Sequence, residues 1–200
     1  MDDQKSEAKD VGKNMMTDNI QTVLYTEEQI LDRVEDLAIA LTKHYYNKDL
    51  IVLAIMNGSV IFVGDLLRKI PLPLELHTIA ASSYGAGSTS SGTVKISGAM
   101  PENVHDKHLL ILDDIFDSGR TLEHLAEQAS SLPGVLSIKT CVLVEKLRER
   151  ETQFRPDFIG LTIPDEFVVG YGLDYAGLYR NLPCLATLKI QECGDISPHS

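Results

Sequence analysis

The chain has no tryptophan, only three cysteines and no long hydrophobic run. Cys141, Cys184 and Cys193 show no paired spacing, which excludes a disulfide-rich secreted scaffold and favours a reducing, cytoplasmic setting. No stretch approaches the ~18 apolar residues that a membrane-spanning helix requires, and the first residues lack the apolar segment of a secretory signal. We therefore expect a cytoplasmic protein without a membrane partner.

Basic residues are also scarce, with 18 Lys and Arg against 29 Asp and Glu, which gives a net charge of −11. A chain with this balance has no general attraction for nucleic acid or for anionic lipid. A phosphorylated ligand would therefore need local hydrogen-bond donors and a metal ion.

The composition suits one globular domain, since 44% of the 200 residues are hydrophobic and 24% are charged. The polar residues 1–20 are expected to form a disordered N-terminal tail, residues 21–192 a single domain, and residues 193–200 a flexible C-terminal tail. No internal repeat or domain linker is visible.

The hydrophobic pattern predicts strands that alternate with helices. A helix over 26–44 is indicated by the capping box of Thr26 and Gln29 and by an apolar stripe. Further helices are expected after Ser59 and after Thr121. The expected strands cover 50–56, 74–81, 93–96, 109–112, 137–144, 157–163 and 185–190. This order predicts an α/β fold with a mainly parallel, twisted sheet flanked by helices, which binds ligands at the carboxyl ends of its strands.

The stretch LLILDDIFDSGRTL at 109–122 carries the clearest chemical signal. A helix that begins after a buried strand presents unpaired main-chain N–H groups, and a glycine lets an anion approach them closely. The residues that would hold one phosphate group in this way are Ser118, Gly119, Arg120 and Thr121.

The carboxylates of this stretch require a different partner, because they repel a phosphate. Asp113 and Asp114 accept hydrogen bonds when ionised, so they suit neighbouring sugar hydroxyls or metal-bound water. A diol site beside a phosphate site describes a ribose 5-phosphate. Asp117 would then lie over the reactive side of the sugar.

Each part of this stretch also has a simpler interpretation. Acidic residues after a strand are often solvated turn residues. A Walker loop is excluded because Asp114 stands where a glycine is needed and Arg120 where a lysine is needed. A dinucleotide fingerprint is excluded at Gly85 and Gly87 because Ser90 occupies its last glycine position. The combination is more specific than its parts.

Together with three other segments, the stretch resembles the type I phosphoribosyltransferases. LAIMNGSVIFVGDLLRKI is similar to the pyrophosphate loop of that family, and SSYGAGSTSSGTVKI to its flexible catalytic loop. VEKLRERETQFRPDFIGLTIPDEFVVGYGLDYAGLYRNLP is similar to the base-binding end of the hypoxanthine-guanine branch. The resemblance covers about residues 25–190 and implies the type I fold, with a small hood formed by the terminal segments.

The resemblance implies purine salvage by a magnesium-dependent enzyme. The 5-phosphoribosyl group of phosphoribosyl pyrophosphate (PRPP) would pass to hypoxanthine or guanine, giving IMP or GMP and pyrophosphate. Asp117 would be the acid–base residue near purine N7. Arg180 would bind pyrophosphate, and Asp174 with Asp113 would bind Mg²⁺. A homodimer or homotetramer is expected.

The resemblance also assigns the purine side and the mobile loop. Lys146 would donate to the 6-oxo group, Phe167 would stack on the purine, and the main chain at Val168 would accept from the guanine amine. A loop around Ser83 and Tyr84 would close over the site.

The pyrophosphate loop departs from the family pattern. Asn57, followed by Gly58, stands where the family commonly has lysine, so this position keeps a donor but loses a charge. The family often has a cis peptide bond here, which would join Met56 to Asn57.

Two rival functions use the same fold. A PRPP-sensing regulator that binds nucleic acid would need a basic surface, which the net charge of −11 disfavours. An adenine or orotate transferase is disfavoured by Lys146 and by the segment EFVVGYGLDY.

Overall fold

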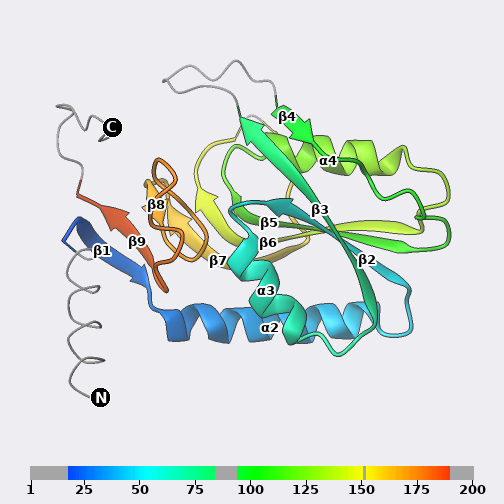
Figure 1. The fold of residues 1–200 in the computed structure, drawn as a ribbon, viewed down its shortest axis with the longest axis horizontal. Coiled ribbons are helices and arrows are strands. Elements are labelled where there is room, and N and C mark those ends of the chain that lie inside the picture. Colours follow the sequence, from blue (N-terminus) through cyan, green and yellow to red (C-terminus); the bar gives the residue numbers. More distant parts are fainter. Residues whose placement is uncertain (1–17, 84–93, 151, 190–200) are drawn as a thin grey trace, which may run out of the picture.

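The computed structural model describes residues 18–83, 94–150 and 152–189 and contains two sheets (Figure 1). The larger sheet has six strands in the order β4-β3-β2-β5-β6-β7, all parallel except β4. Their bounds are β2 Leu50–Met56, β3 Leu74–Ser83, β4 Val94–Ser97, β5 His108–Phe116, β6 Ser137–Leu147 and β7 Phe158–Pro164. The predicted α/β fold with a mainly parallel sheet is confirmed.

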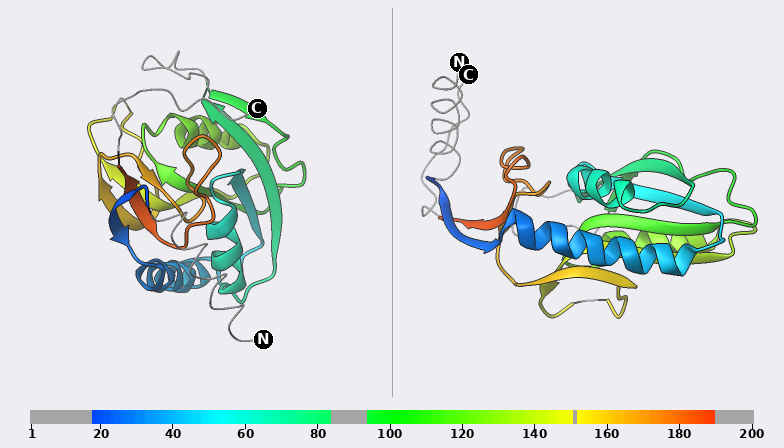
Figure 2. Two further views of the ribbon diagram at one scale, coloured as in Figure 1. Left: turned by 60° about the vertical axis from the view of Figure 1, so that its left-hand side comes forward. Right: turned by 90° about the horizontal axis from the view of Figure 1, so that it is seen from below.

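Helices cover both faces of this sheet, because its central strands are apolar on both sides. Alternate residues of β2 belong to different core clusters: Leu50 and Val52 pack with the helices α2 and α3, whereas Ile51 and Leu53 pack with α4. The helices are α2 Glu27–Tyr45, α3 Val60–Arg68 and α4 Arg120–Ser130. Figure 2 shows the layers from two further directions.

Helix α2 begins where the sequence predicts. The Thr26 hydroxyl accepts from the Gln29 N–H at 3.3 Å, and the Gln29 side chain accepts from the Thr26 N–H at 3.0 Å. This capping box satisfies two N–H groups that a helix start otherwise leaves unpaired. Within the described ranges, no helix is long and apolar enough to cross a membrane.

The smaller sheet forms the expected hood from segments far apart in the sequence. Its antiparallel order is β1-β9-β8, with β1 Ile20–Tyr25, β8 Val168–Val169 and β9 Leu185–Leu188. Strand β1 was not predicted, and it starts at the last residue assigned to the N-terminal tail. Residues 18 and 19 of the expected tail are described as well, and the Asn19 carbonyl accepts from the Lys189 N–H at 2.8 Å. Residues 1–17 and the expected C-terminal tail lie outside the described residues.

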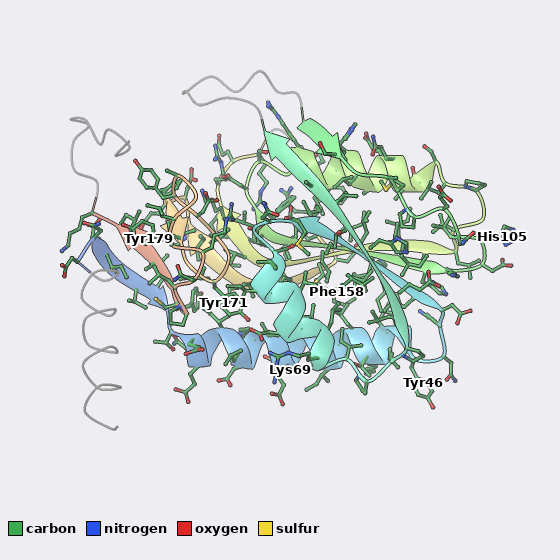
Figure 3. The ribbon with its side chains drawn as sticks, viewed as in Figure 1. Tyr46, Lys69, His105, Phe158, Tyr171 and Tyr179 are labelled. Carbon is green, nitrogen blue, oxygen red and sulfur yellow. The ribbon has the colours of Figure 1, made fainter. Side chains whose placement is uncertain are left out.

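The hood is joined to the helical layer by a buried tyrosine (Figure 3). The Tyr171 hydroxyl donates to Asp65 Oδ2 of α3 at 2.6 Å, and burial raises the pKa of this phenol. On the same side of the sheet, Lys69 after α3 pairs with Glu35 of α2 at 3.0 Å. The first contact joins the segment after β8 to α3, and the second joins the end of α3 to α2.

One prediction about strand length needs correction. We expected β5 to end at Leu112, but it continues to Phe116 and carries Asp113 and Asp114 within it. Pairing with β2 stops at Leu112, whereas pairing with β6 continues to Phe116. The acidic pair therefore lies where β5 has lost one neighbour, and this exposes one strand edge to a ligand.

Candidate active site

A cavity of about 320 Å³ opens at the carboxyl ends of β2 and β5. It brings together most of the predicted PRPP residues. Those that line it are Asn57, Gly58, Asp113, Asp114, Asp117, Ser118, Gly119, Thr121, Asp174 and Arg180. Arg120, the first residue of α4, is not among the lining residues.

Two adjacent carboxylates form the floor of this cavity. The Asp114 N–H donates to Asp113 Oδ1 at 3.0 Å, and the Ile115 N–H donates to Asp114 Oδ1 at 2.9 Å. Burial raises the pKa of Asp113 well above its usual value, and the charge of Asp114 raises it further. Burial also raises the pKa of Asp114, although Arg180 opposes this shift. Such a pair favours a ligand that supplies donors or positive charge.

The loop after β2 touches this acidic pair. A Cβ atom on Gly58 would lie 1.7 Å from Asp114 Oδ2, so the carboxylate occupies the space that any side chain would need. The Met56–Asn57 peptide bond is cis, as the resemblance implied. Ser59 is buried, and its hydroxyl donates to the Ile55 carbonyl.

The turn before α4 matches an anion-binding helix start. Gly119 has φ of +84° and precedes Arg120, where α4 begins. A Cβ at Gly119 would also meet Thr152 at 2.6 Å and Phe116 at 2.9 Å, so glycine is required on both grounds. A long hydrogen bond of 3.5 Å runs from the Arg120 N–H to Ser118 Oγ, and Gly119 has no side chain to cap the helix, so the N–H groups at this helix start can turn to an anion.

The predicted pyrophosphate and metal residues pair with each other. Arg180 Nη2 lies 2.7 Å from Asp174 Oδ1, and its Nη1 donates to the Gly172 carbonyl at 2.7 Å. A Cβ at Gly172 would lie 1.9 Å from the Gly58 carbonyl oxygen. The hood loop therefore packs directly against the loop after β2, a contact that the sequence did not reveal.

Asp117 is held by two cations from the next strand and its extension. Lys146 Nζ lies 3.2 Å from Asp117 Oδ2, and Arg148 Nη1 lies 2.8 Å from Asp117 Oδ1. The sequence identified Asp117 and Lys146 for separate roles, but it gave no sign of their pairing or of Arg148.

Arg150 is a further residue that sequence reasoning missed. Its side chain is only 5% exposed, and its Nη1 lies 2.9 Å from Glu145 Oε1. It also donates to the carbonyls of Asp117 and Lys146, and its guanidinium lies 4.4 Å from the centre of the Phe116 ring. Arg150 thus ties the phosphate turn to β6. Its position in the charged run EKLRERE concealed this role.

None of the three predicted purine residues, Lys146, Phe167 and Val168, is among the residues that line this cavity. Phe167 is 51% exposed, meets Tyr175 edge-on at 5.6 Å and lines a second cavity of about 660 Å³. Val168 is buried in β8, which pairs with β9. Of the expected mobile loop, Tyr84 lies outside the described residues, and Ser83 is the last residue of β3.

Comparisons with known proteins agree with this geometry. The model of the phosphoribosyl transferase domain matches residues 21–176. A hypoxanthine-guanine phosphoribosyltransferase of Staphylococcus aureus is 39% identical over 174 residues, covering 87% of this chain and 97% of that protein. A crystal structure of a hypoxanthine phosphoribosyltransferase from S. aureus has a TM-score of 0.81 and 39% identity, covering 88% of this chain and 95% of that one.

A longer relative places a similar sequence within a larger protein. The bifunctional protein TilS/HprT of Listeria monocytogenes is 38% identical over 178 residues, which cover 89% of this chain. The matched region spans only 27% of that protein's length.

Proposed function

Because this chain belongs to the phosphoribosyl transferase family, we propose that it transfers the 5-phosphoribosyl group of PRPP to hypoxanthine or guanine. The products would be IMP or GMP and pyrophosphate, as in purine salvage. The S. aureus relatives, which this chain matches over nearly their whole length, support this choice of substrate.

One observation carries the proposal: the acidic pair Asp113 and Asp114 lines the same cavity as Ser118, Gly119 and Thr121 of the turn before α4. The turn offers main-chain N–H groups and hydroxyls to a 5-phosphate, while the carboxylates offer acceptors to ribose hydroxyls. This arrangement fits a ribose phosphate better than either group alone. The negative pair also favours the positive charge that develops on the ribose when pyrophosphate leaves.

The remaining roles follow from position and chemistry. Asp117 would accept a hydrogen bond from N7–H of the purine and take this proton as N9, whose lone pair is free in that tautomer, attacks the anomeric carbon. Lys146 would donate to the 6-oxo group, and Phe167 would stack on the ring. Val168 would supply a main-chain acceptor for the guanine amine. Arg180 and Asn57 would donate to the pyrophosphate.

Magnesium suits the donor set of this cavity. Asp113, Asp114 and Asp174 line it with carboxylate oxygens, which Mg²⁺ prefers. In the described part of the chain, no three acidic, histidine or cysteine side chains form a ready metal cluster. We therefore propose that Asp174 and Asp113 contribute to Mg²⁺ binding, while PRPP and water supply most of the oxygens. The ion would neutralise the leaving pyrophosphate.

We also propose a cytoplasmic setting and a homodimer or homotetramer. The described cysteines, Cys141 and Cys184, are free, which is compatible with a reducing compartment. Light scattering of the purified protein measures the assembly directly.

The proposal is tested by an assay with PRPP and five nucleobases, with and without Mg²⁺. We expect nucleotide formation from hypoxanthine or guanine that requires both PRPP and Mg²⁺. Adenine should give none, because Lys146 selects a 6-oxo group, and the pyrimidines uracil and orotate should give none, because they lack the N7 that Asp117 would contact. Failure to bind or consume PRPP with any base would refute the proposal.

A further inference from the structure

Lys146 and Asp117 neutralise each other at the centre of the proposed purine side. Their charged atoms are 3.2 Å apart, and the Lys146 side chain is only 12% exposed. The proposed function, on which this inference rests, requires both groups to turn to the purine, Lys146 to its 6-oxo group and Asp117 to N7. Purine binding must therefore weaken an ion pair whose lysine is largely buried and whose carboxylate is 41% exposed.

Arg148 shares Asp117 with Lys146. It follows Lys146 by two positions, and its N–H donates to the Lys146 carbonyl at 3.2 Å, so the chain turns directly after β6. This turn brings both cations to one carboxylate, with Arg148 Nη1 2.8 Å from Asp117 Oδ1. The same nitrogen lies 3.7 Å from Asp165 Oδ1, in the segment between β7 and Phe167. Arg148 thus joins the phosphate turn to the purine segment.

Because Asp117 is bound by both Arg148 and Lys146, its ion pair with Lys146 is weaker than it would be alone. The single negative charge of Asp117 attracts two cations. The contact of Arg148 with Oδ1 also fixes the direction in which Oδ2 points toward Lys146. If Arg148 were absent, Asp117 could rotate fully toward Lys146 and become its exclusive partner. The purine would then have to break a stronger ion pair.

We propose that Arg148 is a positioning residue for the purine. By holding Asp117 through Oδ1, it limits the attraction between Asp117 and Lys146 and leaves the Lys146 ammonium available to the 6-oxo group. Arg148 itself touches neither PRPP nor the reacting atoms. Its effect falls on purine affinity and spares PRPP affinity.

The test compares R148Q with R148K at low ionic strength. R148Q should raise the KM for hypoxanthine roughly two- to five-fold, the size expected of a half-exposed ion pair. The KM for PRPP and kcat should stay unchanged, and R148K should restore the KM for hypoxanthine because it keeps the charge. R33Q is the matched control, since Arg33 forms an exposed ion pair with Asp36 on α2, and it should change none of these constants.

Salt provides a second readout that needs no variant. The Arg148 side chain is 41% exposed and that of Lys146 only 12%, so salt screens the Arg148–Asp117 pair more than the Lys146–Asp117 pair. The wild-type KM for hypoxanthine should therefore rise from low to high salt, whereas that of R148Q should change less.

Three outcomes would overturn the inference while leaving the proposed function intact. They are an unchanged KM for hypoxanthine in R148Q, an equal rise in the KM for PRPP, and a wild-type KM for hypoxanthine that is independent of salt. A wild-type protein that makes no nucleotide from any base would instead refute the proposed function.

Discussion

The ribose-phosphate half of the site and its purine half are built differently. The first comes largely from one uninterrupted stretch, residues 113–121, of which all but Arg120 line the cavity. The second depends on side chains from β6, its extension and the hood, which meet through ion pairs and aromatic contacts. Glycines shape the first half, and charged side chains hold the second.

The ribose-phosphate half therefore depends on backbone geometry, whereas the purine half depends on contacts between side chains. Gly58 and Gly119 leave no room for a Cβ, so the ribose-phosphate half tolerates little change. The ion pairs of Asp117 involve side chains that are partly exposed and can exchange partners when a purine arrives. We expect the first half to be preformed and the second to adjust on binding.

Asp117 lies where the halves meet, so its replacement should have the largest effect. Asp117→Asn should lower kcat by about 10²–10⁴, the usual contribution of a positioned acid–base group. PRPP should still bind, because the acidic pair and the turn remain. Rapid-quench turnover with calorimetric PRPP titration measures both. Turnover at the wild-type rate would remove Asp117 from the mechanism.

Arg150 tests whether the purine half depends on buried charge. Arg150→Met should lower the free energy of unfolding by about 3–5 kcal/mol, because it leaves Glu145, whose side chain is only 13% exposed, without its cation. Urea denaturation measures this loss. Arg33→Met, at an exposed pair, should cost at most about 1 kcal/mol. Equal losses in the two variants would show that burial of Arg150 adds nothing.

A substitution at Gly58 tests whether the ribose-phosphate half depends on close packing of its backbone. Gly58→Ala would place Cβ 1.7 Å from Asp114 Oδ2, so the carboxylate must move. We expect kcat/KM for PRPP to fall about 100-fold, because a shift of about 1 Å in a group that positions the substrate has an effect of this size. Gly64→Ala on α3 is the matched control, since a Cβ there would meet no described atom within 4 Å apart from its chain neighbours and the backbone of its own helix. It should keep full activity and gain roughly 0.5–1 kcal/mol of stability.

The substitution Asp113→Asn should have the smallest effect, a gain in stability that depends on pH. A pKa raised in the folded state means that Asp113 favours folding below the ordinary pKa of 3.8 and loses this contribution as pH rises through the folded pKa. Asp113→Asn removes the buried charge while its oxygen still accepts from the Asp114 N–H. Its Tm should exceed that of wild type at neutral pH, and the gap should shrink in acid.

The control for this comparison is Asp32→Asn on the exposed face of α2. It removes an equal charge without changing a buried group. A pH-dependent gap of the same size in this variant would assign the effect to net charge rather than to the acidic pair.

Much of the ribose-phosphate half could be predicted because its parts are close in sequence. The spacing of Asp113, Asp117 and Gly119 specified a strand end, a turn and a helix start, and the cavity contains all three. The same reasoning placed the end of β5 too early, because it assumed that carboxylates follow a strand. Pairing with β6 carries the strand past both of them.

The purine half was less accessible to sequence reasoning. Arg148 and Arg150 stand in a run of alternating charges, which usually marks a solvated surface. The contact between Gly172 and Gly58 joins residues more than a hundred positions apart. Such partners depend on how the hood docks against the main sheet, and no local pattern encodes that docking.

The sequence by itself determined the alternation of strands and helices, the acidic strand end and the glycine turn. These features follow from side-chain periodicity and from backbone preferences within a few residues. Only the tertiary structure decided which cations hold Asp117, how deeply Arg150 is buried and where the hood meets the loop after β2. Ion pairs and burial depend on distances between segments, and those distances exist only after the chain has folded.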